Sequence, residues 1–592
     1  MDGYTGTILY VDLSRGSINP KPFPEGYKRL YIGGRGLGVR LLSDLVDPGT
    51  DPDSDANVLV FATGPLTGSI MPLGSRYDVI TKSPLTGTVT SANSGGFFGP
   101  TMKRAGFDAV VFLGRAADPV YLSLKEDTAE LRDAAPLKGM TTTGTTGAIQ
   151  EDLGDPKARV SCIGPAGENR CRFASIMNEG TRAAGRGGVG AVMGGKNLKA
   201  VAVSGEGTIE PADIAAAREA RDEIRKKIEE NPITGKGLHN YGTSVLVNII
   251  NESHILPTRN YQSAYFPQAE ALSGETQKEK IVKRGKGCFG CLVACGRETE
   301  EAGEKGEGPE YETTWAFGPD LGISDLSVVT SANHLCNELG LDTISTGATI
   351  ACAMEMSEKG YIKEQIKWGD GPAVLDLVRK IATRDGIGDE LAEGSFRFAS
   401  KYGHPELSMS VKKQELPAYD PRGLQGHGLE YATSVRGGDH VYGYMIAPEV
   451  LGSPQKLDPF TDEGKAAWTK TFQDLTAAID ASGLCLFTSF AIGAPEYARM
   501  VSAVTGMNLD AGELLKIGER IWNLQRMFNI RAGFSDSDDT LPVRLLTEPL
   551  HEGAPKDRVW VREPLLSQYY QLRGWDEKGV PTPEKLQELG IA

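Results

Sequence analysis

Three cysteines, Cys288, Cys291 and Cys295, lie within eight residues in the order Cys-x2-Cys-x3-Cys. Thiolate sulfurs bind soft or borderline metals, and two cysteines separated by two residues can reach one metal centre from a single turn of chain. The segment from Gly285 to Gly296 contains four glycines, which leave backbone amides exposed to donate hydrogen bonds to cluster sulfurs. This constellation predicts an iron–sulfur cluster and hence a redox enzyme.

Zinc is the alternative metal for these thiols. Zinc sites usually combine two closely spaced ligand pairs, whereas this sequence has no second Cys-x2-Cys and no His-x3-His. The order also differs from the Cys-x3-Cys-x2-Cys of enzymes that bind S-adenosylmethionine, which disfavours that chemistry. A fourth thiolate must come from far along the chain, and Cys485 is the best candidate. The other cysteines lie in apolar or mixed runs typical of a core: Cys162, Cys171, Cys336 and Cys352.

Two glycine-rich stretches imitate nucleotide-binding motifs. Residues 185–190 fit the dinucleotide fingerprint, but polar residues 178–182 stand where a strand should lead into the first glycine. Residues 190–196 have the spacing of a P-loop, yet Asn197 replaces the Ser or Thr that should hold magnesium. We therefore expect neither a nicotinamide enzyme nor a nucleoside triphosphatase.

The loops at residues 181–188 and 91–96 still combine backbone amides with guanidinium groups, those of Arg182 and Arg186 in the first loop and Arg76 shortly before the second. Arginines and closely spaced amides are the groups that bind phosphate. Unless these loops are simply tight turns, they predict a phosphorylated cofactor that is not a nucleotide.

The overall composition limits the possible partners. The formal net charge is -15, and no dense cluster of Lys and Arg offsets it, so nucleic acid is not an expected partner. Residues 1–4 lack the features of a secretory signal, and apolar runs such as residues 109–114 are too short to span a bilayer. We expect a cytoplasmic protein with no membrane span.

Several domains must position these side chains, because 592 residues exceed what one core usually supports. Short β-rich runs separated by Gly and Pro give way to helical periodicity after about residue 211, and a Pro- and Gly-bearing stretch near residues 416–428 marks a second boundary. We predict an α+β multidomain fold, with a β-sheet-rich domain at residues 1–208 and mainly α-helical domains at residues 209–415 and 416–592. Strands are expected at 6–12, 58–63, 77–82, 109–114 and 199–205, and helices at 215–229, 326–338, 346–358, 372–383, 465–481 and 510–529.

A short internal repeat connects the two helical regions: Asn337-Glu-Leu-Gly-Leu-Asp342 is echoed by Asp480-Ala-Ser-Gly-Leu-Cys485. Together with the cysteines and the glycine-rich loops, it makes the chain resemble the tungsten-containing aldehyde ferredoxin oxidoreductases along nearly its whole length. Further markers of the resemblance are the runs at residues 3–12, 31–38, 64–68, 91–96, 308–313, 431–433 and 436–440.

The resemblance implies a tungsten bis-pyranopterin (tungstopterin) whose phosphates are bridged by magnesium, beside a 4Fe-4S cluster that Cys485 completes. Asn93 and the Ala183 carbonyl are expected near the magnesium. One departure is Asn337, because the family usually has Asp there. The positions that match pterin contacts of the family are Arg76, Asn93, Gly95, Arg182, Ala183, Asn337, Asp342, Asp480 and Leu484.

The resemblance also implies the oxidation of an aldehyde to a carboxylic acid with oxygen from water. Glu312 and His440 match the active-site pair of the family. We expect His440 to polarise the aldehyde oxygen and Glu312 to activate water or move its proton, since buried carboxylates and imidazoles can be tuned near neutrality. Electrons are expected to reach ferredoxin or an iron–sulfur subunit, and the same site can run in reverse. Glu310 is expected only in a structural ion pair.

Three questions stay open in the sequence. Benzoyl-CoA-type reductase subunits share this cofactor arrangement, although Glu312 and His440 and the lack of a long insertion for CoA favour the aldehyde enzyme. A non-enzymatic electron-transfer module would leave the pterin loops unexplained. Residues 331–334, Ser-Ala-Asn-His, lack the Glu of the Glu-x-x-His motif that holds an interface metal in some dimeric members, so either a homodimer without it or a heteromeric complex is expected.

Overall fold

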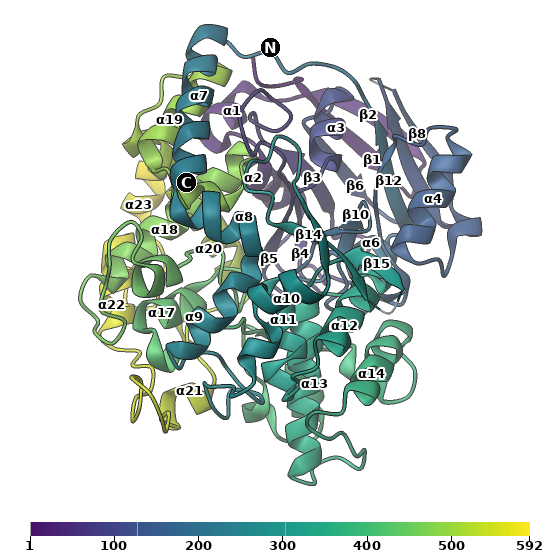
Figure 1. Cartoon of the computed structure of the whole chain (residues 1–592). Helices are drawn as coiled ribbons and strands as arrows, with labels where there is room; N and C mark the ends of the chain where they lie inside the picture. The colour runs from purple at the N-terminus through teal and green to yellow at the C-terminus, as the bar shows by residue number, and fades with distance from the viewer. Residues whose placement is uncertain (1, 127, 302, 592) are drawn as a thin grey trace.

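The computed structural model describes residues 2–126, 128–301 and 303–591. Two six-stranded sheets form the N-terminal part of the chain, at the upper right of Figure 1. The first has the order β2 (Ser17–Pro22), β1 (Thr7–Asp12), β6 (Ala109–Leu113), β3 (Leu59–Thr63), β4 (Tyr77–Lys82) and β5 (Val89–Ser94). The second has the order β11 (Arg182–Ala184), β10 (Ile176–Asn178), β9 (Arg159–Cys162), β12 (Leu198–Ser204), β7 (Val120–Lys125) and β8 (Thr128–Asp133).

The central strands of the first sheet are apolar because both of their faces are covered. Every residue of β3 is buried, and its side chains alternate between two hydrophobic clusters. Leu59 and Phe61 belong to one cluster, whereas Val60 and Ala62 belong to the other. Successive side chains of a strand point to opposite faces, so a continuous apolar run marks a sheet that is packed on both sides.

Helices make up most of the remaining chain. The helices of residues 311–383 lie below the sheets in Figure 1, whereas the helix of residues 214–230 and the green-to-yellow helices after residue 425 lie to the left. The helices that bear on the site or on the packing are α2 (Gly34–Leu45), α3 (Phe98–Arg104), α6 (Val189–Gly195), α7 (Ile214–Glu230), α11 (Tyr311–Phe317), α12 (Leu326–Leu339), α13 (Thr343–Glu358), α14 (Gly371–Thr383), α17 (Gln425–Thr433), α18 (Lys465–Ser482), α20 (Ala511–Arg531), α21 (Val543–Thr547) and α22 (Leu565–Arg573).

The structure confirms the predicted α+β architecture and each predicted strand and helix, with ends shifted by a few residues. Helix α13 is buried on all sides from Ile344 to Met356, and it therefore carries apolar or small residues around its whole circumference. The sequence analysis did not anticipate every element, and one omission lies beside the predicted cysteine loop. A three-stranded antiparallel sheet, β13 (Val282–Lys286), β14 (Gly296–Glu301) and β15 (Glu304–Glu307), interrupts the helical region.

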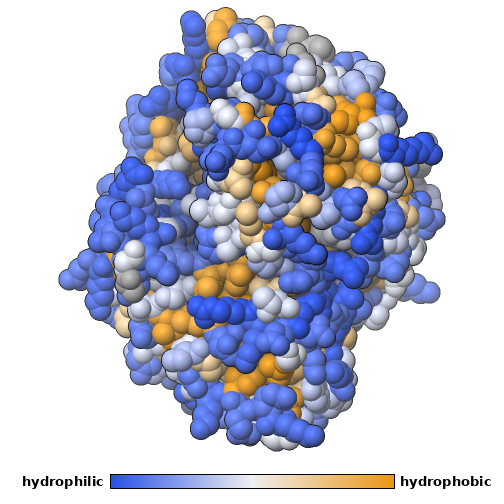
Figure 2. All heavy atoms as spheres, turned by 90° about the vertical axis from the view of Figure 1, so that its right-hand side faces the viewer, coloured by the Kyte–Doolittle hydropathy of each residue, from blue (hydrophilic) through white to orange (hydrophobic). Residues whose placement is uncertain are grey.

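The surface seen from the right-hand side of Figure 1 is mostly hydrophilic, with separate hydrophobic patches (Figure 2). Among the helices that the structure describes, none is both long and apolar enough to cross a membrane.

Candidate active site

The structure brings the four predicted cysteines together. Cys288, Cys291 and Cys295 lie half-buried in the loop between β13 and β14, whereas Cys485 lies buried just after α18. Burial raises the pKa of Cys291, and the neighbouring thiols of Cys485 and Cys288 raise it further. Within the described ranges, no three Cys, His, Asp or Glu side chains converge closely enough for a single metal ion.

Arg76 and Gly95 form the wall beside these thiols. Arg76 Nη2 donates a hydrogen bond to Cys485 Sγ at 3.0 Å, and its Nη1 donates to Asn93 Oδ1 at 3.3 Å. A Cβ atom at Gly95 would lie 2.9 Å from Cys288 Sγ. The absence of a side chain at this glycine therefore allows the cysteine loop to approach strand β5.

The two repeats of the sequence form the same structure, a helix end. Gly340 follows α12 with φ of 76°, and Gly483 follows α18 with φ of 88°. Glycine adopts this left-handed conformation at little cost and commonly terminates helices. The chain therefore turns sharply at both positions, and it carries Asp342 and Cys485 to equivalent places beyond the two helices.

Both helix ends rest on the N-terminal sheets through backbone contacts. The Ser175 amide donates to the Gly340 carbonyl at 2.9 Å, and the Arg76 amide donates to the Gly483 carbonyl at 3.1 Å. A Cβ atom at Gly64 would overlap the backbone of the second helix end. Hydrogen-bonded backbones in direct contact fix the two repeats relative to the glycine-rich loops.

Two adjoining cavities, of about 330 and 200 Å³, lie between the sheets and these helix ends. They share Arg76, Gly185, Val441 and Phe487 as lining residues. Leu484 lines neither cavity and is fully buried in the core. The predicted residues on the larger cavity are Arg76, Gly95, Arg182, Ala183, Cys288, Cys295, Glu312, Asn337, Asp342 and His440, and those on the smaller are Arg76, Asn93, Asp480 and Cys485.

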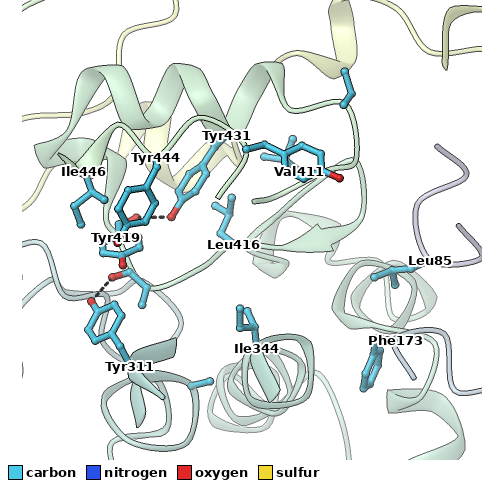
Figure 3. Packing of buried hydrophobic residues seen from close by; sticks show 14 of the residues in the cluster. Leu85, Phe173, Tyr311, Ile344, Val411, Leu416, Tyr419, Tyr431, Tyr444 and Ile446 are labelled. Atoms are coloured by element: carbon cyan, nitrogen blue, oxygen red, sulfur yellow. Dashed lines mark hydrogen bonds between the residues drawn. The ribbon is translucent and has the colours of Figure 1, made fainter. Parts of the chain in front are cut away.

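Glu312 and His440 face each other across the larger cavity. The Glu312 Oε1 atom lies 3.6 Å from His440 Nε2, slightly beyond hydrogen-bond distance, and the two side chains are 13% and 15% exposed. Glu312 occupies the first turn of α11, and its Oε2 atom accepts a hydrogen bond from the Ala418 amide at 3.0 Å. The Tyr311 hydroxyl donates to the Ala418 carbonyl at 2.8 Å (Figure 3). These two bonds fix the carboxylate relative to the 417–419 segment.

Burial moves the pKa values of these two side chains in opposite directions. It raises the pKa of Glu312 to about 8, although the Ala418 amide lowers it. It lowers the pKa of His440 to about 3, although neighbouring Asp439 raises it. Desolvation disfavours the charged form of either group. At pH 7 the imidazole is therefore neutral, and the carboxyl group holds its proton in most molecules.

Two buried carboxylates shape the loop that carries His440. Asp439 Oδ1 accepts hydrogen bonds from the Val441 and Tyr442 amides at 2.8 and 2.9 Å. Glu430, on α17, accepts from the amides of two further loop residues, 443 and 445, both at 2.9 Å. The loop therefore has little freedom to move His440 away from Glu312.

The anion-binding loops predicted from the sequence line the same cavities. Arg182 contacts Glu307 at 3.2 Å and Glu310 at 3.5 Å, so Glu310 forms an ion pair as expected, although it also lines the larger cavity. Arg186 was not among the cofactor contacts that the resemblance implied. It donates to Asp342 Oδ2 at 3.1 Å and to the Gly438 carbonyl at 2.7 Å. Its position in the same glycine-rich loop is the sequence feature that could have identified it.

At residues 185–190 the structure differs from the expectation that no strand leads into the first glycine. A strand, β11, does lead directly into Gly185, and helix α6 follows at Val189. However, β11 is a three-residue edge strand paired antiparallel with β10. A dinucleotide fold needs a parallel strand, helix and strand, so the conclusion against that motif holds for a different reason.

Several buried polar atoms of the site have no hydrogen-bond partner within the described part of the chain: Arg76 Nε, Glu312 Oε1 and His440 Nδ1. Leaving a buried polar atom unpaired costs about 1–3 kcal/mol. All three residues line the larger cavity, so a polar occupant fits this space. Arg436 and Tyr442 also line the smaller cavity. Neither was predicted as a site residue, although Arg436 lies in the 436–440 run that marks the family resemblance.

Comparison with known proteins gives matches over almost the whole chain. Residues 8–205 match the family model for the aldehyde ferredoxin oxidoreductase N-terminal domain, and residues 219–591 match the model for domains 2 and 3. The chain is 50% identical to the tungsten-containing aldehyde ferredoxin oxidoreductase of Pyrococcus furiosus, with 100% of both chains covered, and 49% identical to that of Thermococcus kodakarensis, again over 100% of both. Among solved structures, it is similar to the BamBC active-site complex of benzoyl coenzyme A reductase, with a TM-score of 0.87 and 28% identity over 100% of this chain and 97% of that one.

Proposed function

The chain belongs to the aldehyde ferredoxin oxidoreductase family and is an oxidoreductase, and on this premise we propose that it oxidises aldehydes to carboxylic acids at a tungstopterin. Water supplies the oxygen, and two electrons and two protons leave for each aldehyde. The electrons pass through a 4Fe-4S cluster to ferredoxin or to an iron–sulfur partner subunit. The observation that carries the proposal is that the Glu312–His440 pair lies on the same two joined cavities as three of the four cysteines, Cys288, Cys295 and Cys485.

The residues around these cavities fit the cofactor. Asp342 on the larger cavity and Asp480 on the smaller one offer carboxylate acceptors for the amino-pyrimidine edge of one pterin each. Asn93 and the Ala183 carbonyl offer oxygen ligands for magnesium, which prefers such hard donors, and Arg182 offers positive charge to the phosphates. When bound, the tungstopterin would supply the acceptor for the two electrons of the aldehyde. Asn337 lines the cavity where the family has Asp, and as an amide it both accepts and donates.

We assign different proton roles to His440 and Glu312. Since the pKa of His440 is lowered to about 3, its imidazole is a weak base at neutral pH, and it acts as a neutral hydrogen-bond donor to the aldehyde oxygen. Glu312 has a pKa of about 8, near the value that suits a general base at neutral to alkaline pH. Its ionised Oε1 atom takes the proton of the attacking water. The reverse reaction, acid reduction, uses the same pair with the carboxyl group as proton donor.

Arg76 supports a short path for electrons out of the cavity. Its guanidinium contacts Cys485 Sγ and Asn93 and also lines both cavities, so it bridges the proposed pterin and cluster sites. Its positive charge stabilises thiolates, which are the form that binds iron. Cys288, Cys291, Cys295 and Cys485 supply the four ligands of the cluster.

Elemental analysis of anaerobically purified protein, with viologen reduction by a panel of aldehydes, tests the proposal. We expect about one tungsten and four irons per chain, and dye reduction that depends on the aldehyde. Zinc as the only metal, or fully metallated protein that no aldehyde can drive, would refute it.

A second candidate is an aromatic acyl-CoA reductase subunit, which the likeness to the benzoyl coenzyme A reductase complex favours. The same dye assay separates the two functions. An aldehyde oxidoreductase reduces viologen with aldehydes, whereas an acyl-CoA reductase active site would instead oxidise a cyclic dienoyl-CoA.

A further inference from the structure

The cysteine loop gives the redox site one side near the surface. Cys288, Phe289, Cys291 and Leu292 are half-buried, and Gly290 between them is exposed. Cys485, on the inner side, is only 7% exposed. The thiols therefore connect the cavities, which Cys288, Cys295 and Cys485 line, with a loop at residues 288–292 that reaches the surface at Gly290.

An aromatic pair lies beside the cysteines of this loop. The ring of Phe289 lies edge-on to that of Phe97, with 6.4 Å between the ring centroids. Backbone hydrogen bonds hold the loop in place, from the Phe289 amide to the Gly96 carbonyl at 3.2 Å and from the Leu73 amide to the Gly290 carbonyl at 3.1 Å. Two half-buried phenyl rings on a hydrogen-bonded backbone therefore adjoin the cysteines in the chain and in the fold.

Two arginines lie on these rings. The guanidinium carbon of Arg104 is 4.7 Å from the centroid of Phe289, and that of Arg159 is 4.8 Å from the centroid of Phe97. Both arginines are half-buried. A guanidinium held over an aromatic face is restricted in position, so less entropy is lost when it binds a carboxylate.

The charges of these two arginines are not neutralised by ion pairs. Within residues 2–126, 128–301 and 303–591, neither Arg104 nor Arg159 has a carboxylate within ion-pair distance, although the charge of buried Glu179 acts on Arg159 at longer range. In contrast, each of the three cations of neighbouring β13 pairs with a glutamate of β14 or β15. In a chain with net charge -15, two guanidinium groups beside the cysteine loop thus lack a carboxylate partner among the described residues, and Arg104 Nη2 donates only to a backbone carbonyl, that of Gly68, at 3.2 Å.

We propose that Arg104, Arg159, Phe97 and Phe289 form the docking site for an acidic iron–sulfur electron-carrier protein of the ferredoxin class. This inference rests on the proposed function, because it takes the cysteine loop as the edge from which electrons leave. Arginines and aromatic rings are the residues that interfaces favour, and opposite charge steers a carrier toward the correct face. Each aldehyde oxidised releases two electrons, so two one-electron carriers dock and leave in turn.

Glutamine substitution of both arginines tests the docking site. The holoenzyme with Arg104→Gln and Arg159→Gln is assayed with an acidic 4Fe-4S ferredoxin, and its rate is normalised to aldehyde-dependent viologen reduction by the same preparation. We expect kcat/KM for ferredoxin to fall about tenfold, equivalent to about 1.4 kcal/mol, mainly through a higher KM. The decrease of kcat/KM with added salt should also become shallower.

Two further variants control for other effects. Arg558→Gln is the matched control, because Arg558 lies 4.4 Å from the ring of Phe460 in the same kind of contact, in the segment between α21 and α22 at the left of Figure 1 and away from β14. It should leave ferredoxin kinetics unchanged. The Arg104→Lys and Arg159→Lys double variant keeps both charges and should retain most of the rate and its salt dependence.

The outcomes separate the two proposals. Normal ferredoxin kinetics in the double glutamine variant would overturn the docking site while leaving the aldehyde chemistry intact. A wild-type enzyme that no aldehyde can drive to reduce viologen would instead refute the proposed function. If the double variant changed the oligomeric state on gel filtration without altering normalised ferredoxin rates, the face would join copies of this chain and the proposal would be wrong.

Discussion

Replacing Glu312 with Gln tests the central chemical assignment. The structure raises the pKa of this carboxyl group from 4.5 to about 8, chiefly through burial, and the side chain is only 13% exposed. At about 1.4 kcal/mol for each pH unit between these two values, ionising Glu312 in the folded protein costs about 4 to 5 kcal/mol relative to the unfolded chain. The positive end of α11 favours the anion by at most about 2 kcal/mol, so burial determines the direction.

The sign of the stability change follows from this raised pKa. Between pH 4.5 and about 8 the folded state holds a proton on Glu312 that the unfolded chain has lost. The contribution of this group to stability is therefore complete below pH 4.5 and is lost as the pH rises through about 8. Glu312→Gln removes the titration, so the thermal midpoint of the apoprotein variant should exceed that of the wild type by an amount that grows over this range.

Infrared difference spectroscopy measures the protonation directly in protein without its cofactors. The spectrum of wild type minus Glu312→Gln should contain the carbonyl band of a protonated carboxylic acid at pH 6, and the band should disappear with a midpoint near pH 8. With the cofactors bound, kcat/KM for aldehyde oxidation should rise about tenfold from pH 7 upward, because the ionised form is the base. Glu312→Gln should keep its metals and lose about 10²- to 10⁴-fold in turnover.

Two results would refute this reasoning. A carboxyl band that titrates near pH 4.5 would mean that the site is hydrated and the pKa is not raised. Unchanged turnover in Glu312→Gln would remove the carboxylate from the mechanism, even if its pKa proved correct.

Further variants test the cluster and the loop. Gly95→Ala places a methyl group 2.9 Å from the Cys288 thiol and should lower the bound iron, measured against the exposed control Gly147→Ala, whose Cβ meets nothing within 4 Å. Cys485→Ala should abolish the electron paramagnetic resonance signal of the reduced cluster, and full cluster occupancy would contradict the long-range fourth ligand. Glu430→Gln turns an amide donor toward one of two backbone amides in the loop of His440 and should lower the free energy of unfolding by about 1–3 kcal/mol. Turnover should fall, whereas its pH profile should match that of the wild type. An unchanged melting temperature would argue against a positioning role for Glu430.

The sequence alone determined the features that depend on neighbouring residues. Cysteine spacing predicted a metal-binding loop, apolar runs predicted β3 and β4, and helical periodicity predicted α12 and α18. The repeated Gly-Leu pairs indicated that the same local structure, a helix end, occurs twice, because the left-handed backbone of Gly340 and Gly483 is a local property. The assignment to a family also came from motifs in order along the chain. The division at residues 208 and 415 remains a prediction.

Only the tertiary structure decided which distant groups meet. Cys485 lies 190 residues beyond Cys295, and no local pattern could place its thiol against Arg76. The pKa values of Glu312 and His440 depend on the water that packing excludes, which neither side chain encodes by itself. Arg104 and Arg159 carried no motif, and they were distinguished only when folding placed them on the two rings beside the cysteine loop. Contacts and desolvation are properties of the assembled core, so they follow from the fold and not from residue spacing.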